Sequence, residues 1–272
     1  MGRTALKVIS YVGLTILSLL TFLPILWMVL TALKPENEVF STELIGSELA
    51  WNNFYNAWTS LPFGQFFLNS IIVTAAVTFL EVATSSLAAY AFARLKFKGR
   101  DLLFYLYLGT LMVPAQVVLI PQYILMDKLS WVDTYQALIL PMAFTAFGTF
   151  LLRQFFLTIP YELEEAAKMD GCSRFRLYFQ IILPLAKPAL ATLAVFSFVS
   201  QWNNFFWPLI ITNTAEMQTL TVGLRMFQGI HGTEWHLMMA ASTITIIPTL
   251  LVFVFFQRYL AEGITISGIA GR

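Results

Sequence analysis

The sequence predicts an all-α, polytopic integral membrane protein with six transmembrane helices. Of its 272 residues, 58% are hydrophobic and 11% are charged, whereas an average soluble domain is about 25% charged. Several uncharged stretches also reach the roughly 20 residues that a helix needs to cross a bilayer. This composition excludes a soluble globular domain, because too little polar surface remains to cover an apolar core.

Six apolar stretches lie between the charged residues, and we expect each to be one span of a single transmembrane domain, residues 1–272. They comprise residues 8–33, 69–92, 102–126, 134–152, 188–211 and 237–257. Six prolines interrupt these stretches, but neighbouring helices can satisfy the backbone groups that a proline frees in a membrane bundle. The stretch at 69–92 is rich in alanine and serine, which predicts a helix packed closely against other helices.

Lysine and arginine predict the orientation. Of 16 such residues, thirteen fall at the two ends of the chain or in the loops at 94–100 and 153–187, leaving Lys34, Lys128 and Arg225 on the other side. This asymmetry predicts that both termini lie in the cytoplasm. The first stretch exceeds the 7–15 residues of a signal-peptide core, so we expect it to be retained as a helix.

Other function classes lack their signatures. The net charge of +1 is spread over loops and gives no basic patch for nucleic acid. Cys172 is the single cysteine, and His231 and His236 are the only histidines, so we expect no metal site. The chain has no Gly-x-x-x-x-Gly-Lys-Ser/Thr phosphate loop. We therefore expect no ATP hydrolysis by this chain and no enzymatic activity.

The loop at about 158–187 carries the clearest motif. Pro160 fits a first helical turn, and three acidic residues behind it complement the positive end of the helix dipole; these are Glu162, Glu164 and Glu165. Gly171 can adopt the left-handed conformation that ends a helix, and Ser173 can cap a second helix that runs through Gln180. The loop is predicted to form two short helices joined by a tight turn.

Leu163, Ala166 and Ala167 fall at i, i+3 and i+4 and predict a small apolar face on the first of these helices. Such a face permits close docking into a groove of a partner, with a glutamate at its rim. The alternative is a helix that rests on lipid headgroups. Helices of that kind carry a basic polar face, whereas this one carries three glutamates and one lysine, which favours docking to a protein.

The spacing of this loop resembles the EAA loop of permease subunits of ATP-binding cassette (ABC) importers. The residues that match, with Asp170 beside them, are Glu165, Ala166, Ala167, Asp170, Gly171, Ile181, Leu183 and Pro184. Further segments resemble the MalG-like permeases of carbohydrate importers: Leu33-Lys34-Pro35, Trp51-Asn52-Asn53-Phe54, residues 89–94, residues 202–205 and Gln257-Arg258-Tyr259. The tail departs from that group, because it ends in Gly271-Arg272 rather than Lys-Gly.

The resemblance implies a MetI-like permease fold in a bacterial or archaeal inner membrane, surrounded by lipid. It implies a second, homologous permease, two ATP-binding cassette subunits and an extracellular solute-binding protein as partners. ATP and magnesium would be held by the partner subunits, and no cofactor by this chain. The EAA loop would couple ATPase closure to the pore, and the transported solute would be a sugar of the di- or oligosaccharide class.

Two polar features inside the spans remain open. Gln201, Trp202, Asn203 and Asn204 form a polar and aromatic cluster that fits either the substrate path or contacts between helices. Glu81 lies within an apolar stretch, where a charge costs about 3 kcal/mol, and pairing with the sister permease is favoured over proton coupling.

Two other function classes would leave recognisable signatures in the sequence. A proton- or ion-driven transporter would show several buried carboxylates and an internal repeat, and a membrane enzyme would show clustered catalytic groups. Neither pattern is found in the sequence. The particular solute stays open among disaccharides, longer oligosaccharides, polyols and glycerol phosphate esters.

Overall fold

The computed structural model describes residues 2–229 and 232–269, and these residues are almost entirely helical. The one sheet is a short antiparallel hairpin of β1 (Gln228–Gly229) and β2 (Gly232–Thr233). Three helices are long and apolar enough to cross a membrane without interruption: α1 (Gly2–Ala32), α3 (Phe63–Arg94) and α14 (Trp235–Ile269). The prediction of an all-α membrane protein is confirmed.

Three further candidate spans are bent pairs of helices. α4 (Arg100–Gly109) and the 3₁₀ turn η2 (Thr110–Met112) meet α5 (Ala115–Lys128) at 99°. The segment α6 (Tyr135–Ile139) with η3 (Leu140–Met142) meets α7 (Ala146–Thr158) at 42°. The segment running from α9 (Arg174–Leu177) through η4 (Tyr178–Ile182) and α10 (Leu183–Leu185) meets α11 (Lys187–Trp202) at 76°. The described residues thus hold three to six spans, depending on whether each bent pair counts as one.

The bends differ from the uninterrupted stretches expected at 102–126, 134–152 and 188–211. At the first bend, Val113 is extended because the ring of Pro114 disfavours a helical residue before it. The last stretch breaks between Trp202 and α12 (Phe206–Ile211). Pro24, Pro121 and Pro248, in contrast, lie inside helices, as the membrane setting allows.

The chain divides into two compact units, of which the first comprises Met1–Gln65 and Val222–Ile247. Its elements beyond α1 and the hairpin are η1 (Glu36–Glu38), α2 (Asn52–Thr59), η6 (Arg225–Phe227) and the first part of α14. Asn53 donates from Nδ2 to the carbonyl oxygens of Ala32 and Lys34, at 2.9 and 2.8 Å. The motif at 51–54 therefore ties α2 to the end of α1.

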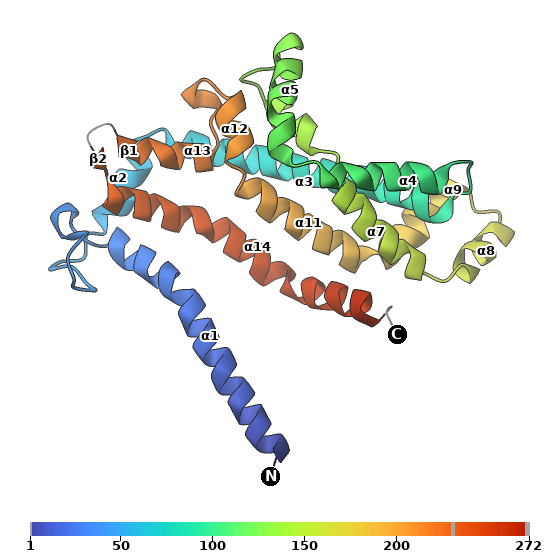
Figure 1. The fold of residues 1–272 in the computed structure, drawn as a ribbon, viewed down its shortest axis with the longest axis horizontal. Helices are drawn as coiled ribbons and strands as arrows, with labels where there is room; N and C mark the ends of the chain where they lie inside the picture. The colour runs from blue at the N-terminus through green and yellow to red at the C-terminus, as the bar shows by residue number, and fades with distance from the viewer. Residues whose placement is uncertain (1, 230–231, 270–272) are drawn as a thin grey trace. The chain divides into compact units, whose positions relative to one another are not determined.

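The second unit comprises Phe66–Thr221 and Pro248–Arg272. It holds most of α3, the bent pairs, α8 (Glu162–Met169), η5 (Ala215–Met217) and α13 (Leu220–Leu224). Within it α3, α7 and α11 lie side by side (Figure 1). Ser85, Ser86 and Ala89 of α3 are buried, which confirms the predicted helix–helix interface. A Cβ on Gly148 of α7 would lie 2.5 Å from Ser85 Oγ, so a larger residue there would require the Ser85 side chain to move.

One hydrophobic cluster of the second unit, the inner core, extends to α8. It is built from α3, α7, α8, α9, η4 and α11 and from Ile159 and Ala186 next to them. Its members are Ala89, Tyr90, Ala93, Leu152, Phe156, Ile159, Ala167, Leu177, Tyr178, Ile182, Ala186, Ala189 and Leu193.

Candidate functional site

The 158–187 loop forms the two predicted short helices. α8 begins after Tyr161, whose carbonyl oxygen accepts from the backbone N–H groups of Glu164 and Glu165 at 3.0 and 3.1 Å. The three glutamates lie in its first turn, as predicted. Pro160 precedes that turn rather than belonging to it. The second helix is α9, and it continues through the π-helical segment η4 instead of ending at Gln180.

Gly171 stops α8 as predicted, with φ +76°. Its N–H donates to Lys168 at 3.0 Å, and the N–H of Cys172 donates to Ala167 at 2.9 Å. These two bonds are the Schellman pattern, which satisfies carbonyls at a helix end and requires a left-handed residue after the cap. Ser173 then caps α9, its Oγ accepting from the N–H of Arg176 at 3.4 Å.

The sides of α8 differ from the expected apolar face. Ala167 is buried in the inner core, whereas Leu163 is 43% exposed and Ala166 is exposed. The expectation that these three residues share one docking face is therefore wrong for Ala167. The helix is rotated so that Glu164 and Ala167, at i and i+3, point inward, and Glu164 is only 3% exposed.

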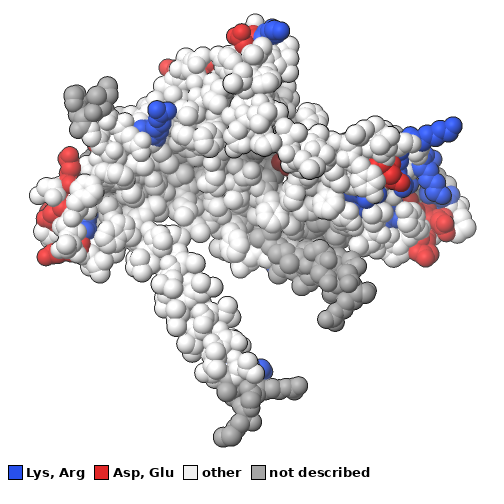
Figure 2. Space-filling view, in the orientation of Figure 1, with Lys and Arg blue, Asp and Glu red and all other residues white. Residues whose placement is uncertain are grey.

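The outward side of the loop defines a candidate docking surface. Met169 and Phe175 are 84% and 76% exposed, and Glu165 is also exposed. We define the docking surface as Leu163, Glu165, Ala166, Met169, Asp170 and Phe175. Ile181 and Leu183 of the motif pack against the inner core, while Pro184 is exposed. Charged side chains gather at the end of this unit that carries α8 and α9, and few are visible over its middle (Figure 2).

Sequence reasoning missed the group that holds α8. Arg94, the last residue of α3, lies 3.2 Å from Glu164 through its Nε and Oε1 atoms, with exposed side-chain fractions of 0% and 3%. Its Nη2 donates to the carbonyl oxygens of Ile159, at 2.5 Å, and Phe156. Its guanidinium lies 4.2 Å from the centre of the Tyr161 ring. The sequence indicates Arg94 as a cytoplasmic positive charge at the end of the 89–94 segment and Glu164 as a residue that complements the helix dipole, but it does not indicate that the two residues meet.

Glu81 is buried at 5% exposure, and it is paired within this chain. Thr145 donates from Oγ1 to its Oε1 at 2.7 Å, and Ser197 donates from Oγ to its Oε2 at 2.6 Å. The expected pairing with a sister permease is therefore wrong, since two helices of the same chain supply the partners. Among the described residues no lysine or arginine forms an ion pair with Glu81. The carboxyl joins α3, α7 and α11.

The residues suggested for a substrate path mark the break after α11. Trp202 is buried, stacked on Phe198 at 5.7 Å and edge-on to Phe67 at 5.7 Å. Asn203 is exposed and donates to Val199 at 2.8 Å. Asn204 donates to Gln201 at 3.4 Å, and its carbonyl oxygen accepts from Thr221 at 2.7 Å. The amide of Asn203 thus binds a backbone carbonyl of α11, the amide of Asn204 binds the side chain of Gln201, and Trp202 packs against other aromatic rings.

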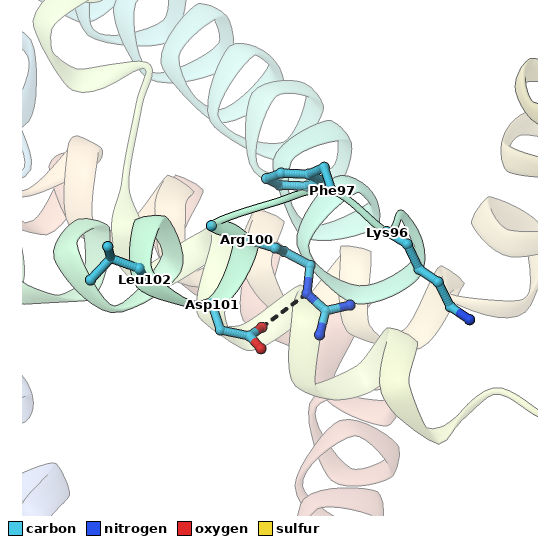
Figure 3. Close-up of a pocket in the computed structure, with 6 residues that line it drawn as sticks. Lys96, Phe97, Arg100, Asp101 and Leu102 are labelled. Atoms are coloured by element: carbon cyan, nitrogen blue, oxygen red, sulfur yellow. Dashed lines mark hydrogen bonds and ion pairs between the residues drawn. The ribbon is translucent and has the colours of Figure 1, made fainter.

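A shallow pocket of about 450 Å³ lies where α3 passes into α4 (Figure 3). Arg100 donates from Nε to Asp101 Oδ1 at 2.9 Å, and the Lys96 ammonium extends away from this pair. None of the residues suggested for a substrate path lines this pocket.

Metal-ligating side chains do not gather within 2–229 and 232–269. No group of three or more His, Cys, Asp or Glu residues there could hold a metal ion. His236 is buried, and His231 lies outside the described residues.

Residues 81–266 match the family described as the inner membrane component of binding-protein-dependent transport systems. That range covers more than half of the chain and includes Glu81, the docking surface and the 201–204 cluster. The chain belongs to this family. It is therefore a multi-pass inner membrane permease of an ABC transport system, and it is not itself an enzyme.

Full-length relatives support this membership. The permease is 34% identical over 279 residues to the arabinooligosaccharides transport system permease protein AraQ of Halalkalibacterium halodurans, covering 100% of both chains. It is 36% identical over 276 residues to the sn-glycerol-3-phosphate transport system permease protein UgpE of Yersinia pestis, covering 98% of both.

The fold also matches a solved structure. A chain of a bacterial ABC transporter that imports the acidic polysaccharide alginate superposes with a TM-score of 0.84, at 23% identity, over 95% of this chain and 98% of that one. A second structure, of an alginate ABC transporter in complex with an alginate pentasaccharide-bound periplasmic protein, superposes with a TM-score of 0.69 at 17% identity. These likenesses concern the fold.

Proposed function

We propose that this permease forms, with a second homologous permease, the translocation path of a sugar importer. An extracellular binding protein delivers the solute, and two ATP-binding subunits drive transport from the cytoplasmic side. The long apolar helix α1 supports this assembly, because most of its side chains are exposed, including Leu14, Leu17 and Leu20. Such a surface requires lipid or another membrane helix around it.

The proposal rests on the two sides of the 158–187 loop. One side is buried against the rest of this chain, and the other is exposed. Its inward side is fixed by Glu164, Ala167 and Leu177, all buried in this chain. Its outward side presents Met169 and Phe175 beside the exposed carboxylate of Glu165. Exposed large apolar side chains rimmed by charge are typical of protein interfaces. A helix that is packed firmly against its own chain is also suited to transmit a movement of a bound partner. We infer that the docking surface binds an ATPase subunit.

A Glu165→Lys variant tests this docking. Reversing the charge at an exposed position should weaken the attachment of the ATPase subunits without disturbing the inner core. We expect the permease to reach the membrane in normal amounts, while the ATPase subunits no longer co-purify with it. Glu48→Lys, an exposed glutamate in the segment before α2, is the matched control and should retain them. Full attachment in Glu165→Lys would contradict docking through this surface.

The solute we propose is a di- or oligosaccharide. Gln201, Asn203 and Asn204 supply amides, which can donate and accept hydrogen bonds as sugar hydroxyls do. A phosphorylated solute favours arginine, and no arginine or lysine occurs between 188 and 211. The named transport roles of the two relatives include both classes, arabinooligosaccharides and sn-glycerol 3-phosphate.

Uptake by the complete importer in proteoliposomes separates these classes. Radiolabelled arabinooligosaccharide and sn-glycerol 3-phosphate would be supplied in turn, each with an excess of the other unlabelled. We expect oligosaccharide uptake that glycerol phosphate does not inhibit. Uptake of glycerol phosphate alone would show that the sugar assignment is wrong while leaving the permease role intact.

A further inference from the structure

The environment of Arg94 is unusual for a residue at the end of a transmembrane helix. Such arginines commonly extend toward headgroups and water, but the side chain of Arg94 is fully buried. Four groups surround its guanidinium: the carboxylate of Glu164, the ring of Tyr161 and the carbonyl oxygens of Phe156 and Ile159. The positive charge is enclosed by the protein instead of serving only to orient the chain.

These four groups belong to different elements. Phe156 and Ile159 lie at the end of α7, where the helix dipole is negative. The carbonyl oxygen of Phe156 also accepts from the N–H of Ile159, the residue that follows α7, at 3.2 Å. Tyr161 and Glu164 belong to the start of α8. Tyr161 also donates from its hydroxyl to the carbonyl oxygen of Ala93, at 3.2 Å. One guanidinium at the end of α3 therefore holds both the end of α7 and the docking helix.

Glu164 has little freedom to leave this position. Its carboxylate is 3% exposed, and apart from Arg94 its ion-pair partner among the described residues is Lys168, at 3.7 Å. Lys168 is itself 55% exposed. A buried carboxylate that loses its main cation is strongly disfavoured, so α8 and α3 are coupled wherever this pair stays intact.

The same helix, α3, also carries the buried carboxyl of Glu81. Arg94 follows Glu81 by thirteen positions in α3, which is about 20 Å at the helical rise of 1.5 Å per residue. Thr145, the N-cap residue of α7, and Ser197 of α11 donate hydrogen bonds to Glu81. Glu81 therefore connects α3 with both helices through hydrogen bonds.

We propose that Arg94 is the positioning residue through which movement of the docking helix α8 reaches α3, and through α3 the helices of the pore. This rests on the proposed docking of an ATPase subunit on α8. The docking surface makes the contact with the ATPase, and Arg94 carries the resulting displacement. Loss of the Arg94–Glu164 pair uncouples ATP hydrolysis from transport and leaves attachment of the ATPase subunits unchanged.

The test measures sugar taken up per ATP hydrolysed by the complete importer in proteoliposomes, with co-purification of the ATPase subunits as a second readout. The variants are Arg94→Gln, Arg94→Lys and Glu164→Gln, with the double variant Arg94→Gln/Glu164→Gln. We expect the ratio to fall about tenfold in Arg94→Gln and Glu164→Gln, within the range typical of energetic coupling between sites. Because the two residues act as a unit, the double variant should lose no more than either single one. Arg94→Lys, which keeps the charge, should fall in between.

Arg153→Gln is the matched control. Arg153 lies in α7, donates to the carbonyl oxygen of Phe92 at 3.3 Å and lies 4.1 Å from the Phe104 ring. These contacts resemble those of Arg94 but do not include α8. The variant should keep the wild-type ratio of uptake to hydrolysis.

Several outcomes overturn the proposal. A purely structural role would lower uptake and hydrolysis together, at a constant ratio, or would keep all three single variants out of the membrane. Detachment of the ATPase subunits in Arg94→Gln would mean that the residue shapes the docking surface instead. Unaltered attachment in Glu165→Lys tests the docking proposal separately, so the failure of one is distinguishable from the failure of the other.

Discussion

Gly171 shows how a single residue fixes the geometry of the loop. Its φ of +76° is a conformation that residues with a Cβ rarely adopt, and a Cβ placed there would meet no atom within 4 Å. The demand for glycine therefore comes from the backbone and not from lack of space. The local pattern of sequence was sufficient to predict this conformation, because a helix stop depends on a few adjacent residues.

Gly171→Val should impair transport without unfolding the permease. A β-branched residue at this φ introduces strain of about 1–3 kcal/mol, which the loop can relieve by changing the angle between α8 and α9. Asparagine tolerates the left-handed conformation, so Gly171→Asn is the control. We expect sugar uptake in proteoliposomes to fall strongly for valine and to stay near wild type for asparagine. Equal uptake by both variants would contradict a backbone requirement at this site.

At the scale of helices, polar side chains join elements whose surfaces are otherwise apolar. Glu81 connects three helices, and Asp133 connects two segments of the second unit. Asp133 Oδ1 accepts from the N–H groups of Asn213 and Thr214, at 2.8 and 3.2 Å, and its Oδ2 accepts from the Thr214 hydroxyl at 2.7 Å. Polar contacts of this kind specify which helices are neighbours. Apolar contacts alone specify the neighbours only weakly.

Replacing Glu81 should destabilise the packing of the three helices. In Glu81→Leu the hydroxyls of Thr145 and Ser197 lose their acceptor, and a buried polar group without a partner costs about 1–3 kcal/mol. Glu81→Gln retains an amide oxygen as an acceptor and should lose less. The measurement is the melting temperature of the detergent-solubilised permease. The interpretation fails if the leucine variant melts at or above the wild-type temperature.

The hydrogen bonds of the Asp133 carboxyl predict that the stability of the folded permease depends on pH. Partial burial, the largest influence, raises the pKa of its carboxyl, but the hydrogen bonds from Asn213 and Thr214 together outweigh it and lower the pKa below 3.8. A carboxyl with a lowered pKa in the folded state stabilises that state above its unfolded pKa. This contribution is lost as the pH falls through the folded value.

Melting temperatures of wild type and Asp133→Asn between pH 6 and pH 3 measure this contribution. Asparagine suits the φ of 62° at this position and keeps an acceptor oxygen without the charge. The difference, about 0.5–1 kcal/mol for a partly exposed group, should be present at pH 6 and shrink as the pH falls toward 3. Asp127→Asn, at an exposed position of α5, is the control. A difference that is constant with pH would exclude the charge of Asp133 as its cause.

At the scale of the whole molecule, the distribution of lysine and arginine predicts the topology. It places the docking surface in the cytoplasm and the hairpin of β1 and β2 outside. Both locations offer a residue for labelling, since Met169 is 84% exposed and Gly229 is exposed in the hairpin.

Single-cysteine variants in a Cys172→Ser background test this topology in intact cells. A membrane-impermeant maleimide should label Gly229→Cys directly, whereas Met169→Cys should react only after the membrane is permeabilised. Labelling of Met169→Cys in intact cells would reverse the orientation and, with it, the proposed side of ATPase docking.

Much of this structure could be predicted from the sequence, because it depends on interactions between neighbouring residues. The length of the apolar stretches predicts the candidate spans. The positive φ of Gly171 is predicted by its position after a helix, and the first-turn glutamates of α8 are predicted by the helix dipole. The motif spacing of Glu165 to Pro184 identified the family resemblance, and the family membership is confirmed. Each of these signals lies within a short segment, where neighbouring residues alone determine the conformation.

Only the tertiary structure decided which distant residues meet. The packing of α3, α7, α8 and α11 decides three features. These are the pairing of Arg94 with Glu164, the two hydroxyl groups that donate to Glu81, and the inward position of Ala167. The bends near Pro114 and after Trp202 depend on it as well, because other prolines in the same chain lie inside continuous helices. Apolar periodicity specifies that a helix is buried but carries no information on its partner, since lipid and protein are equally apolar. Buried polar contacts, which form between segments far apart in sequence, supply that choice.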